Sequence, residues 1–250
     1  VTGLEKGHFR VFEDQVEQDI VHFNQRSAPI SVGLIFDVSA SMGENFNLNR
    51  AKNAIVGFLK EGQEEDEYFL VTFNTRTTLV QSFTRSSETV QNEVATQKAG
   101  GSTALYDAVY MGLEYVRRGS NQKKAIILIT DGEDNSSRYS PSEVREFAKE
   151  SNVQVYAVGM QGLLGYGGTV INNIIRITGG RQFLPVNFND LDYYIGLIHA
   201  ELRSQYVVGY NPNNRIHDGK WRRIRVQLEP LPGLPDISVH AREGYYAPGN

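Results

Sequence analysis

Between residues 28 and 203 the chain alternates short apolar runs with longer amphipathic stretches, and this alternation restricts the folds that it can adopt. Continuous apolar runs rich in β-branched residues are typical of strands that are buried on both faces. Strands that alternate with helices predict an α/β fold, in which a doubly wound, mostly parallel sheet is covered by helices on both sides. The runs lie at residues 30–36, 67–74, 77–83, 124–130, 153–159 and 181–186.

Four stretches between or after these runs predict helices, because their apolar residues recur at helical spacing. One of them opens with Ser140, Pro141 and Glu143, which match an N-cap, a proline at the first helical position and a capping-box glutamate. In the last one Asn189 is the expected N-cap. The expected helices lie within residues 47–62, 103–119, 140–151 and 189–206.

The chain is expected to divide into an α/β core and two β-rich flanks. The runs at 67–74 and 77–83 are joined by a very short link, which predicts a hairpin and one antiparallel edge strand. Residues 1–27 and 204–250 carry β signals, but each flank is too short to form a stable sheet alone. We expect the flanks to pair with each other into a small β-module beside the core, residues 28–203.

Composition excludes several classes of function. A formal net charge of -4 gives no basic surface for nucleic acid. No apolar run approaches about 18 residues, so no transmembrane helix is expected. The chain contains no Cys, which excludes disulfides, thiolate metal sites and cysteine nucleophiles. No signal peptide is visible, but the chain begins with Val1, so a leader or anchor is expected to lie outside it if there is one.

One acidic and two hydroxyl side chains follow the first apolar run of the core at every second position. They are Asp37, Ser39 and Ser41. In an extended loop these three side chains point in the same direction. Taken alone, such a run is also typical of an N-cap cluster before the next helix.

Two further segments place oxygen-bearing side chains at the same expected edge of the sheet. Asp131 directly follows the run at 124–130, and Thr103 stands behind a Gly-Gly pair at the start of an expected helix. Ligands in sheets of this kind bind at the carboxyl ends of the strands. Two carboxylates and three hydroxyls suit a hard cation, and Mg²⁺ prefers such an oxygen set. The sequence therefore predicts a Mg²⁺ site, with Mn²⁺ and Ca²⁺ as alternatives.

These residues match the metal-ion-dependent adhesion site of von Willebrand factor A domains, which the chain resembles over residues 28–203. The resemblance implies that the five positions hold a divalent ion and that an acidic side chain of a partner protein completes its coordination. The three hydroxyls are expected to contact the ion directly, and the two aspartates directly or through water. The flanks resemble those of a subgroup of secreted bacterial proteins, which implies an extracytoplasmic location. The matching positions are Asp37, Ser39, Ser41, Thr103 and Asp131.

Four residues near these positions are candidates for the rim of a binding surface. They are Glu133, Asp134, Gly101 and Tyr166. The alternative for the two acids is a solvated loop, and for the glycine a simple turn. Tyr166 falls in the Gly-rich stretch 162–168, which we interpret as a flexible loop on the same face, since it lacks the order of a phosphate-binding motif.

The leading functional hypothesis is a metal-dependent module for adhesion or recognition, not an enzyme. Its partner would be a protein that exposes an Asp or Glu. The alternative is a Mg²⁺-dependent hydrolase or phosphotransfer enzyme. Against it, the sequence has no phosphate loop, and Glu133 is the one candidate for a general base. A purely structural domain with a degenerate site is a third hypothesis, which the intact set of five residues disfavours.

Overall fold

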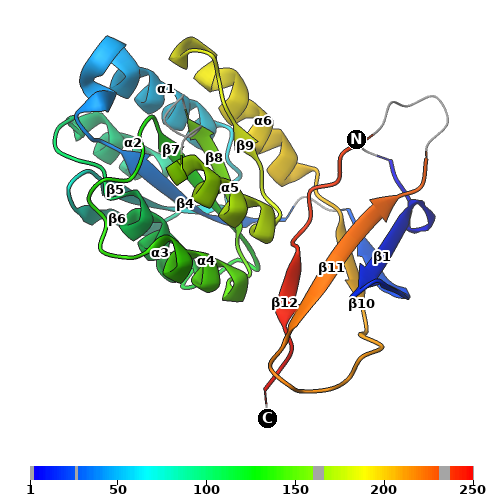
Figure 1. Ribbon diagram of the computed structural model, residues 1–250. Coiled ribbons are helices and arrows are strands. Elements are labelled where there is room, and N and C mark those ends of the chain that lie inside the picture. The colour runs from blue at the N-terminus through cyan, green and yellow to red at the C-terminus, as the bar shows by residue number, and fades with distance from the viewer. Residues whose placement is uncertain (1–2, 26–27, 160–165, 231–236, 250) are drawn as a thin grey trace.

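The computed structural model describes residues 3–25, 28–159, 166–230 and 237–249. Its centre is a six-stranded sheet with the strand order β6-β5-β4-β7-β8-β9 (Figure 1). All neighbouring strands are parallel except β5 and β6, which form an antiparallel hairpin at one edge. The predicted fold class is therefore confirmed. The strands are β4 (Ile30–Asp37), β5 (Glu67–Phe73), β6 (Thr77–Thr84), β7 (Lys123–Thr130), β8 (Gln154–Gly159) and β9 (Gln182–Phe183).

Two adjacent interior strands of the sheet, β4 and β5, explain why the apolar runs are continuous. Every residue of β4 and of β5 is buried, because helices cover both faces of the sheet. Gly33 in β4 is required by this packing: a Cβ atom there would lie 2.3 Å from the ring of Phe69 on β5. The glycine thus leaves room for the Phe69 ring against β4.

In the described segments, six α-helices pack in two layers, one on each face of the sheet (Figure 1). Helices α1, α2 and α6 bury Ile55, Val90 and Ile198 in one apolar core, and α3, α4 and α5 contribute to the other. Within the described residues, no helix is both long and apolar enough to cross a bilayer. The helices are α1 (Asn47–Lys60), α2 (Ser87–Thr96), α3 (Leu105–Val116), α4 (Pro141–Glu150), α5 (Tyr166–Thr178) and α6 (Leu191–Arg203).

Two of these helices were not predicted, for different physical reasons. Helix α2 buries only Val90 and Val94, so its sequence has almost no apolar stripe. Helix α5 is rich in β-branched residues, which intrinsically favour strands, but its apolar face is buried against the sheet. It begins at Tyr166, so the C-terminal end of the stretch interpreted as a loop is helical, while residues 160–165 lie outside the described part.

The helix caps were predicted with mixed success. At α4 the Ser140 hydroxyl accepts a hydrogen bond from the Glu143 amide, and the Glu143 carboxylate accepts one from the Ser140 amide, which confirms the capping box. The expected cap of α6 is wrong. Asn189 lies within a single 3₁₀ turn, η4 (Phe188–Asp190), and Asp190 is the N-cap residue without a side-chain capping bond. The extra turn displaces the start of the helix by one residue.

The two flanks pair with each other in two small antiparallel sheets (Figure 1). Strand β1 pairs with β11, and β3 pairs with β10. The carboxylate of Glu13 connects the sheets, because it accepts hydrogen bonds of 2.8 Å from both Tyr210 and Tyr245. The division of the chain at 27/28 and 203/204 stays a prediction. The flank elements are η1 (Lys6–His8), β1 (Phe9–Glu13), β2 (Val16–Gln18), β3 (Ile20–Asn24), β10 (Val207–Tyr210), β11 (Trp221–Leu228) and β12 (Gly244–Tyr246).

A buried ion pair fixes the point where the chain enters and leaves the α/β core. Asp66, before β5, is 1% exposed and forms an ion pair with Arg203, the last residue of α6. The Asp66 carboxylate also accepts hydrogen bonds from the amides of Ile30 (2.9 Å) and Gln63 (2.7 Å). Burial acts to raise the pKa of Asp66, but the hydrogen bonds and the positive charge of Arg203 outweigh it and lower the pKa below its usual value.

Arg203→Ala is expected to lower the free energy of unfolding by about 3–5 kcal/mol, because it leaves the buried Asp66 carboxylate without its counter-ion. Urea unfolding of the parent and the variant at neutral pH measures this loss. The difference between the two proteins should shrink as the pH falls through the lowered pKa of Asp66, since protonation removes the charge that Arg203 stabilises.

Arg181→Ala is the matched control. Arg181, just before β9, forms an ion pair with Glu201 on α6, the helix that ends with Arg203. The Arg181 side chain is 43% exposed. Exposed pairs contribute about 0–1 kcal/mol, so this variant should unfold close to the parent. Equal losses in the two variants would contradict the role assigned to the buried pair.

Candidate metal centre

The first aspartate of the predicted set is the last residue of β4 and is fully buried. One oxygen of Asp37 accepts a hydrogen bond of 2.8 Å from the Ser39 amide, and the other accepts one of 2.5 Å from the Thr130 hydroxyl at the end of β7. Burial raises the pKa of Asp37 to about 6, against the opposing effect of these hydrogen bonds, and the nearby charge of Asp131 adds to the rise. The fold thus holds this carboxylate in one orientation, away from bulk water.

The two serines connect the first aspartate segment to the second. Ser39 Oγ and Ser41 Oγ lie 3.1 Å apart, and Ser41 Oγ donates a hydrogen bond of 2.8 Å to Asp131 Oδ1. Burial also raises the pKa of Asp131. Four of the five predicted side chains therefore form one continuous set of contacts across the ends of β4 and β7.

Thr103, the fifth residue, lies beside the same carboxylates just before α3. It is buried, and both its hydroxyl and the Asp37 carboxylate lie close to Gly132. A Cβ atom on Gly132 would lie 3.5 Å from Thr103 Oγ1 and 3.9 Å from Asp37 Oδ2. The structure thus places all five predicted residues at one edge of the sheet.

The loop that carries Thr103 is bonded to the loop that carries the serines. The amide of Gly100 donates to the carbonyl of Val38 (2.9 Å), and the amide of Ala40 donates to the carbonyl of Gly101 (3.0 Å). Gly101 has a φ of +86°, a conformation that strongly favours glycine. Its role is therefore to shape this loop. The further assignment of Gly101 to a binding rim stays a prediction.

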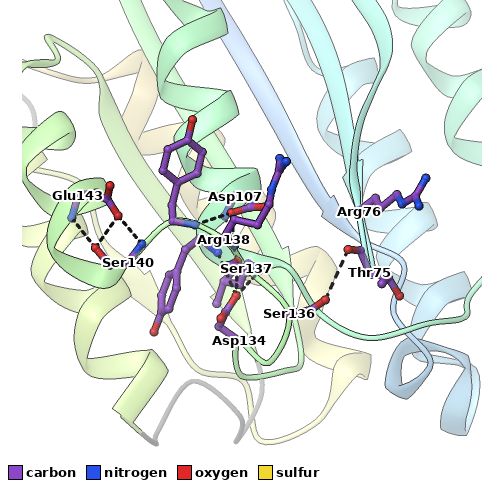
Figure 2. A network of polar contacts seen from close by, with 12 residues as sticks. Thr75, Arg76, Asp107, Asp134, Ser136, Ser137, Arg138, Ser140 and Glu143 are labelled. Carbon is purple, nitrogen blue, oxygen red and sulfur yellow. Dashed lines mark hydrogen bonds and ion pairs between the residues drawn. The ribbon is translucent and has the colours of Figure 1, made fainter.

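The loop after β7 is fixed to the first turn of α3 (Figure 2). Asp134 Oδ1 accepts hydrogen bonds from the amides of Leu105 (2.8 Å) and Tyr106 (3.3 Å) at the open N-terminus of the helix. In return, Asp107 on α3 accepts hydrogen bonds from the amides of Arg138 (2.8 Å) and Tyr139 (3.0 Å). The two loops that carry Thr103 and Asp131 are thereby held together.

These contacts give Asp134 a role that the sequence did not predict. Its Oδ1 is used within the protein as the cap of α3, and the assignment of Asp134 to a binding rim stays a prediction. Glu133 next to it is exposed, as a rim residue should be, and its role stays a prediction. The side chain of Tyr166 lies outside the described part of the structure.

Two residues of the site were missed by sequence reasoning. Thr130 donates to Asp37, and Asn135 fixes the Thr103 backbone: its side-chain oxygen accepts from the Thr103 amide (2.8 Å), and its amide donates to the Thr103 carbonyl (3.0 Å). The one signal for Thr130 is that it is the sole hydroxyl residue in the run 124–130. Nothing local in the sequence distinguishes Asn135 from its polar neighbours.

The donor set fits a hard divalent cation. All five side chains offer oxygen, only two are carboxylates, and Mg²⁺ favours such ligands together with retained water. In the described part of the chain no three or more His, Cys, Asp or Glu residues cluster in a way that could hold a metal ion. A zinc-like site is thus not formed there, and a cation at this edge would depend on the hydroxyls of Ser39, Ser41 and Thr103.

Asp134→Ala should lower the free energy of unfolding by about 1–2 kcal/mol, because two amides at the start of α3 lose their acceptor. Glu133→Ala removes the same charge from the neighbouring, exposed residue and should change the stability by less than about 0.5 kcal/mol. Thermal and urea unfolding of both variants test the difference. A loss as large in Glu133→Ala would show that charge, not capping, is responsible.

Comparison with known proteins agrees with this architecture. A protein of Borreliella burgdorferi is 28% identical over 142 residues, which is 54% of this chain and 41% of that protein. A second relative, from Synechocystis, is covered over 27% of its length, so the chain spans less than half of the curated relatives that it matches.

Solved structures and a family model identify the fold class more closely. The von Willebrand factor type A protein from Catenulispora acidiphila superposes with a TM-score of 0.62 at 15% identity, over 74% of this chain and 50% of that one. The PilB minor pilin from Streptococcus sanguinis gives a TM-score of 0.58 at 17% identity, over 71% and 62%. At such identities these likenesses show the fold alone. The model of the von Willebrand factor type A domain matches residues 31–193, more than half of the chain. The chain therefore belongs to the von Willebrand factor type A domain family.

Proposed function

We propose that this protein is a recognition module that binds a partner protein through a Mg²⁺ ion held by Asp37, Ser39, Ser41, Thr103 and Asp131. The observation that supports this proposal is the convergence of these five oxygen-bearing side chains from three loops at one edge of the sheet. Members of the family are commonly adhesion or recognition modules and are mostly not enzymes.

The composition of the site supports binding of an additional acidic group. Two carboxylates balance the charge of a divalent ion, whereas the three hydroxyls are neutral. An ion held in this way retains Lewis acidity toward one further carboxylate, which an Asp or Glu of the partner would supply. The protein's own contribution is to keep Asp37 desolvated and to orient Ser41 and Asp131 toward each other before a partner arrives.

An extracytoplasmic location fits this function. PilB is a minor pilin, and another similar structure is the von Willebrand factor domain of a pilus tip protein of Porphyromonas gingivalis. Both belong to surface assemblies. We extend this location to the present chain as part of the proposal.

Calorimetric titration of the chelator-treated protein with Mg²⁺, and separately with Mn²⁺ and Ca²⁺, tests the metal site. The parent should bind, and Thr103→Val should weaken binding by more than about tenfold, because it replaces a ligand hydroxyl by a methyl group of similar size, and changes even beside metal ligands cost about 10–100-fold. Asp37→Ala should lose binding. Circular dichroism establishes whether each variant is folded.

Thr84→Val is the control, because it makes the same chemical change away from the site. Thr84 is the last residue of β6 and lies at the end of the sheet opposite the candidate metal centre. It should bind metal like the parent. A parent protein that binds none of the three ions would contradict the proposal. Turnover of p-nitrophenyl phosphate that requires both Mg²⁺ and Asp37 would support the enzymatic alternative instead.

A further inference from the structure

Three basic side chains lie on the loops that form the candidate metal centre, and we call them the basic rim. Arg76 is in the turn between β5 and β6, Lys98 is between α2 and α3, and Arg138 is between β7 and α4. All three are exposed. None of them has a role in the metal centre itself, so their common location calls for a separate explanation.

The loop of Arg76 is attached directly to the loop of Thr103. The carbonyl of Asn74 accepts a hydrogen bond from the Ala104 amide (2.7 Å), and Thr75 Oγ1 accepts one from the Ser102 amide (3.0 Å). The contact is close, since a Cβ atom on Gly101 would lie 2.7 Å from Thr75 Oγ1. Arg76 therefore emerges from a fixed backbone beside the metal centre.

The other two basic residues are placed by equally direct contacts. Lys98 stands two positions before Gly100, whose amide donates to the carbonyl of Val38 in the serine loop (2.9 Å). Arg138 lies two residues after Ser136, whose hydroxyl donates a hydrogen bond of 3.5 Å to the carbonyl of Thr75. The loops of Arg138 and Arg76 therefore meet (Figure 2). Three separate segments thus bring basic groups around one edge of the site.

The charged groups of the rim make few contacts within the described part of the protein. The Arg138 side chain is 89% exposed and contacts Asp107 at 3.3 Å through Nε alone. Within the part of the chain that the structure describes, neither the Arg76 guanidinium nor the Lys98 ammonium has a hydrogen-bond or ion-pair partner. Two exposed or loop acids lie near these segments: Glu44 is in the 3₁₀ helix η2 (Ser41–Phe46), and Glu133 directly follows Gly132. The Gly43 position beside Glu44 is in contact range of Ala99, next to Lys98, and Glu133 shares its loop with Arg138, so acidic and basic side chains alternate around this edge.

We propose that the basic rim of Arg76, Lys98 and Arg138 binds a second acidic side chain of the partner, so that the protein recognises an acidic segment rather than a single carboxylate. This inference rests on the proposed function, because it assumes that the first acid is bound at the metal centre. The fixed backbones of the three loops reduce the ordering that binding requires, and guanidinium groups are suited to paired hydrogen bonds with a carboxylate.

Immobilised Gly/Ser host peptides provide the test. One carries a single central Glu, and a set of others carries a second Glu one to six positions away. With Mg²⁺ present, at least one peptide with two acids should bind the parent about tenfold more tightly than the peptide with one. Arg76→Gln combined with Arg138→Gln should abolish this preference and leave binding of the one-acid peptide unchanged. The preference should also fall with added salt, because exposed charges are screened.

Arg85→Gln combined with Arg117→Gln is the matched control for charge. Arg85 lies beyond the far end of β6 and Arg117 directly follows α3, so both are at the edge of the sheet away from the metal centre. This variant should keep the full preference. Circular dichroism and metal titration should match the parent for both double variants.

The possible failures are distinguishable. Mg²⁺-dependent binding of all peptides with equal affinity would overturn the basic rim and leave the proposed function intact. Absence of Mg²⁺-dependent binding to every peptide would overturn both. A preference for two acids that survives chelator, or equally tight binding of a single-stranded oligonucleotide, would overturn the assignment to an acidic protein segment at the metal centre.

Discussion

The parallel pairing of β4 with β7 is the constraint on which the candidate site depends. Their register places Phe36 opposite Ile129, so the next residues, Asp37 and Thr130, end the two strands together. The hydrogen bond from Thr130 to Asp37 is a direct consequence. A shift of one residue would turn the Asp37 side chain to the opposite face of the sheet relative to β7 and remove it from Thr130. The buried apolar faces of both strands prevent such a shift, so the core, rather than the polar residues, sets the geometry of the site.

The loops beyond these strands are ordered by backbone contacts more than by the predicted metal-binding residues themselves. Val38, Ala40, Gly100 and Gly101 connect two loops through main-chain hydrogen bonds. Asp134 and Asp107 connect the third loop to α3 by carboxylate-to-amide bonds in both directions. Each of these bonds satisfies a backbone group that would otherwise be open at a helix end or in a loop. The arrangement is therefore held by the protein's own groups, and preorganisation of this kind reduces the entropy that binding of a ligand must overcome.

The architecture, and the meeting of the five predicted residues at one edge of the sheet, could be predicted from the sequence because both depend on strong, local signals. Continuous apolar runs identify buried strands, and polar residues directly after those runs identify the ligand-binding edge. What the sequence did not reveal depends on tertiary contacts. The β-branched sequence of α5 is helical because its apolar face is buried, and Asp134 resembles a solvated acid until α3 is seen to begin beside it. The cap of α6 was displaced from Asn189 by one 3₁₀ turn, a difference that the sequence pattern does not record.

The two ends of the sheet carry different groups: the flanks attach at the amino ends of the strands, and the candidate metal centre lies at the carboxyl ends. At the amino ends, Asp66 joins the start of β4 to the end of α6 through Ile30 and Arg203, and the paired flanks continue from there (Figure 1). A cavity of about 770 Å³ lies between the core and the flanks, bordered by the first residues of β7 and β8. The flank strands thus attach at the edge opposite Asp37 and Asp131. Because the chain enters and leaves the core at the amino ends, the flank strands that the structure describes do not cover the carboxyl edge, where the hydroxyls and carboxylates of the candidate metal centre lie.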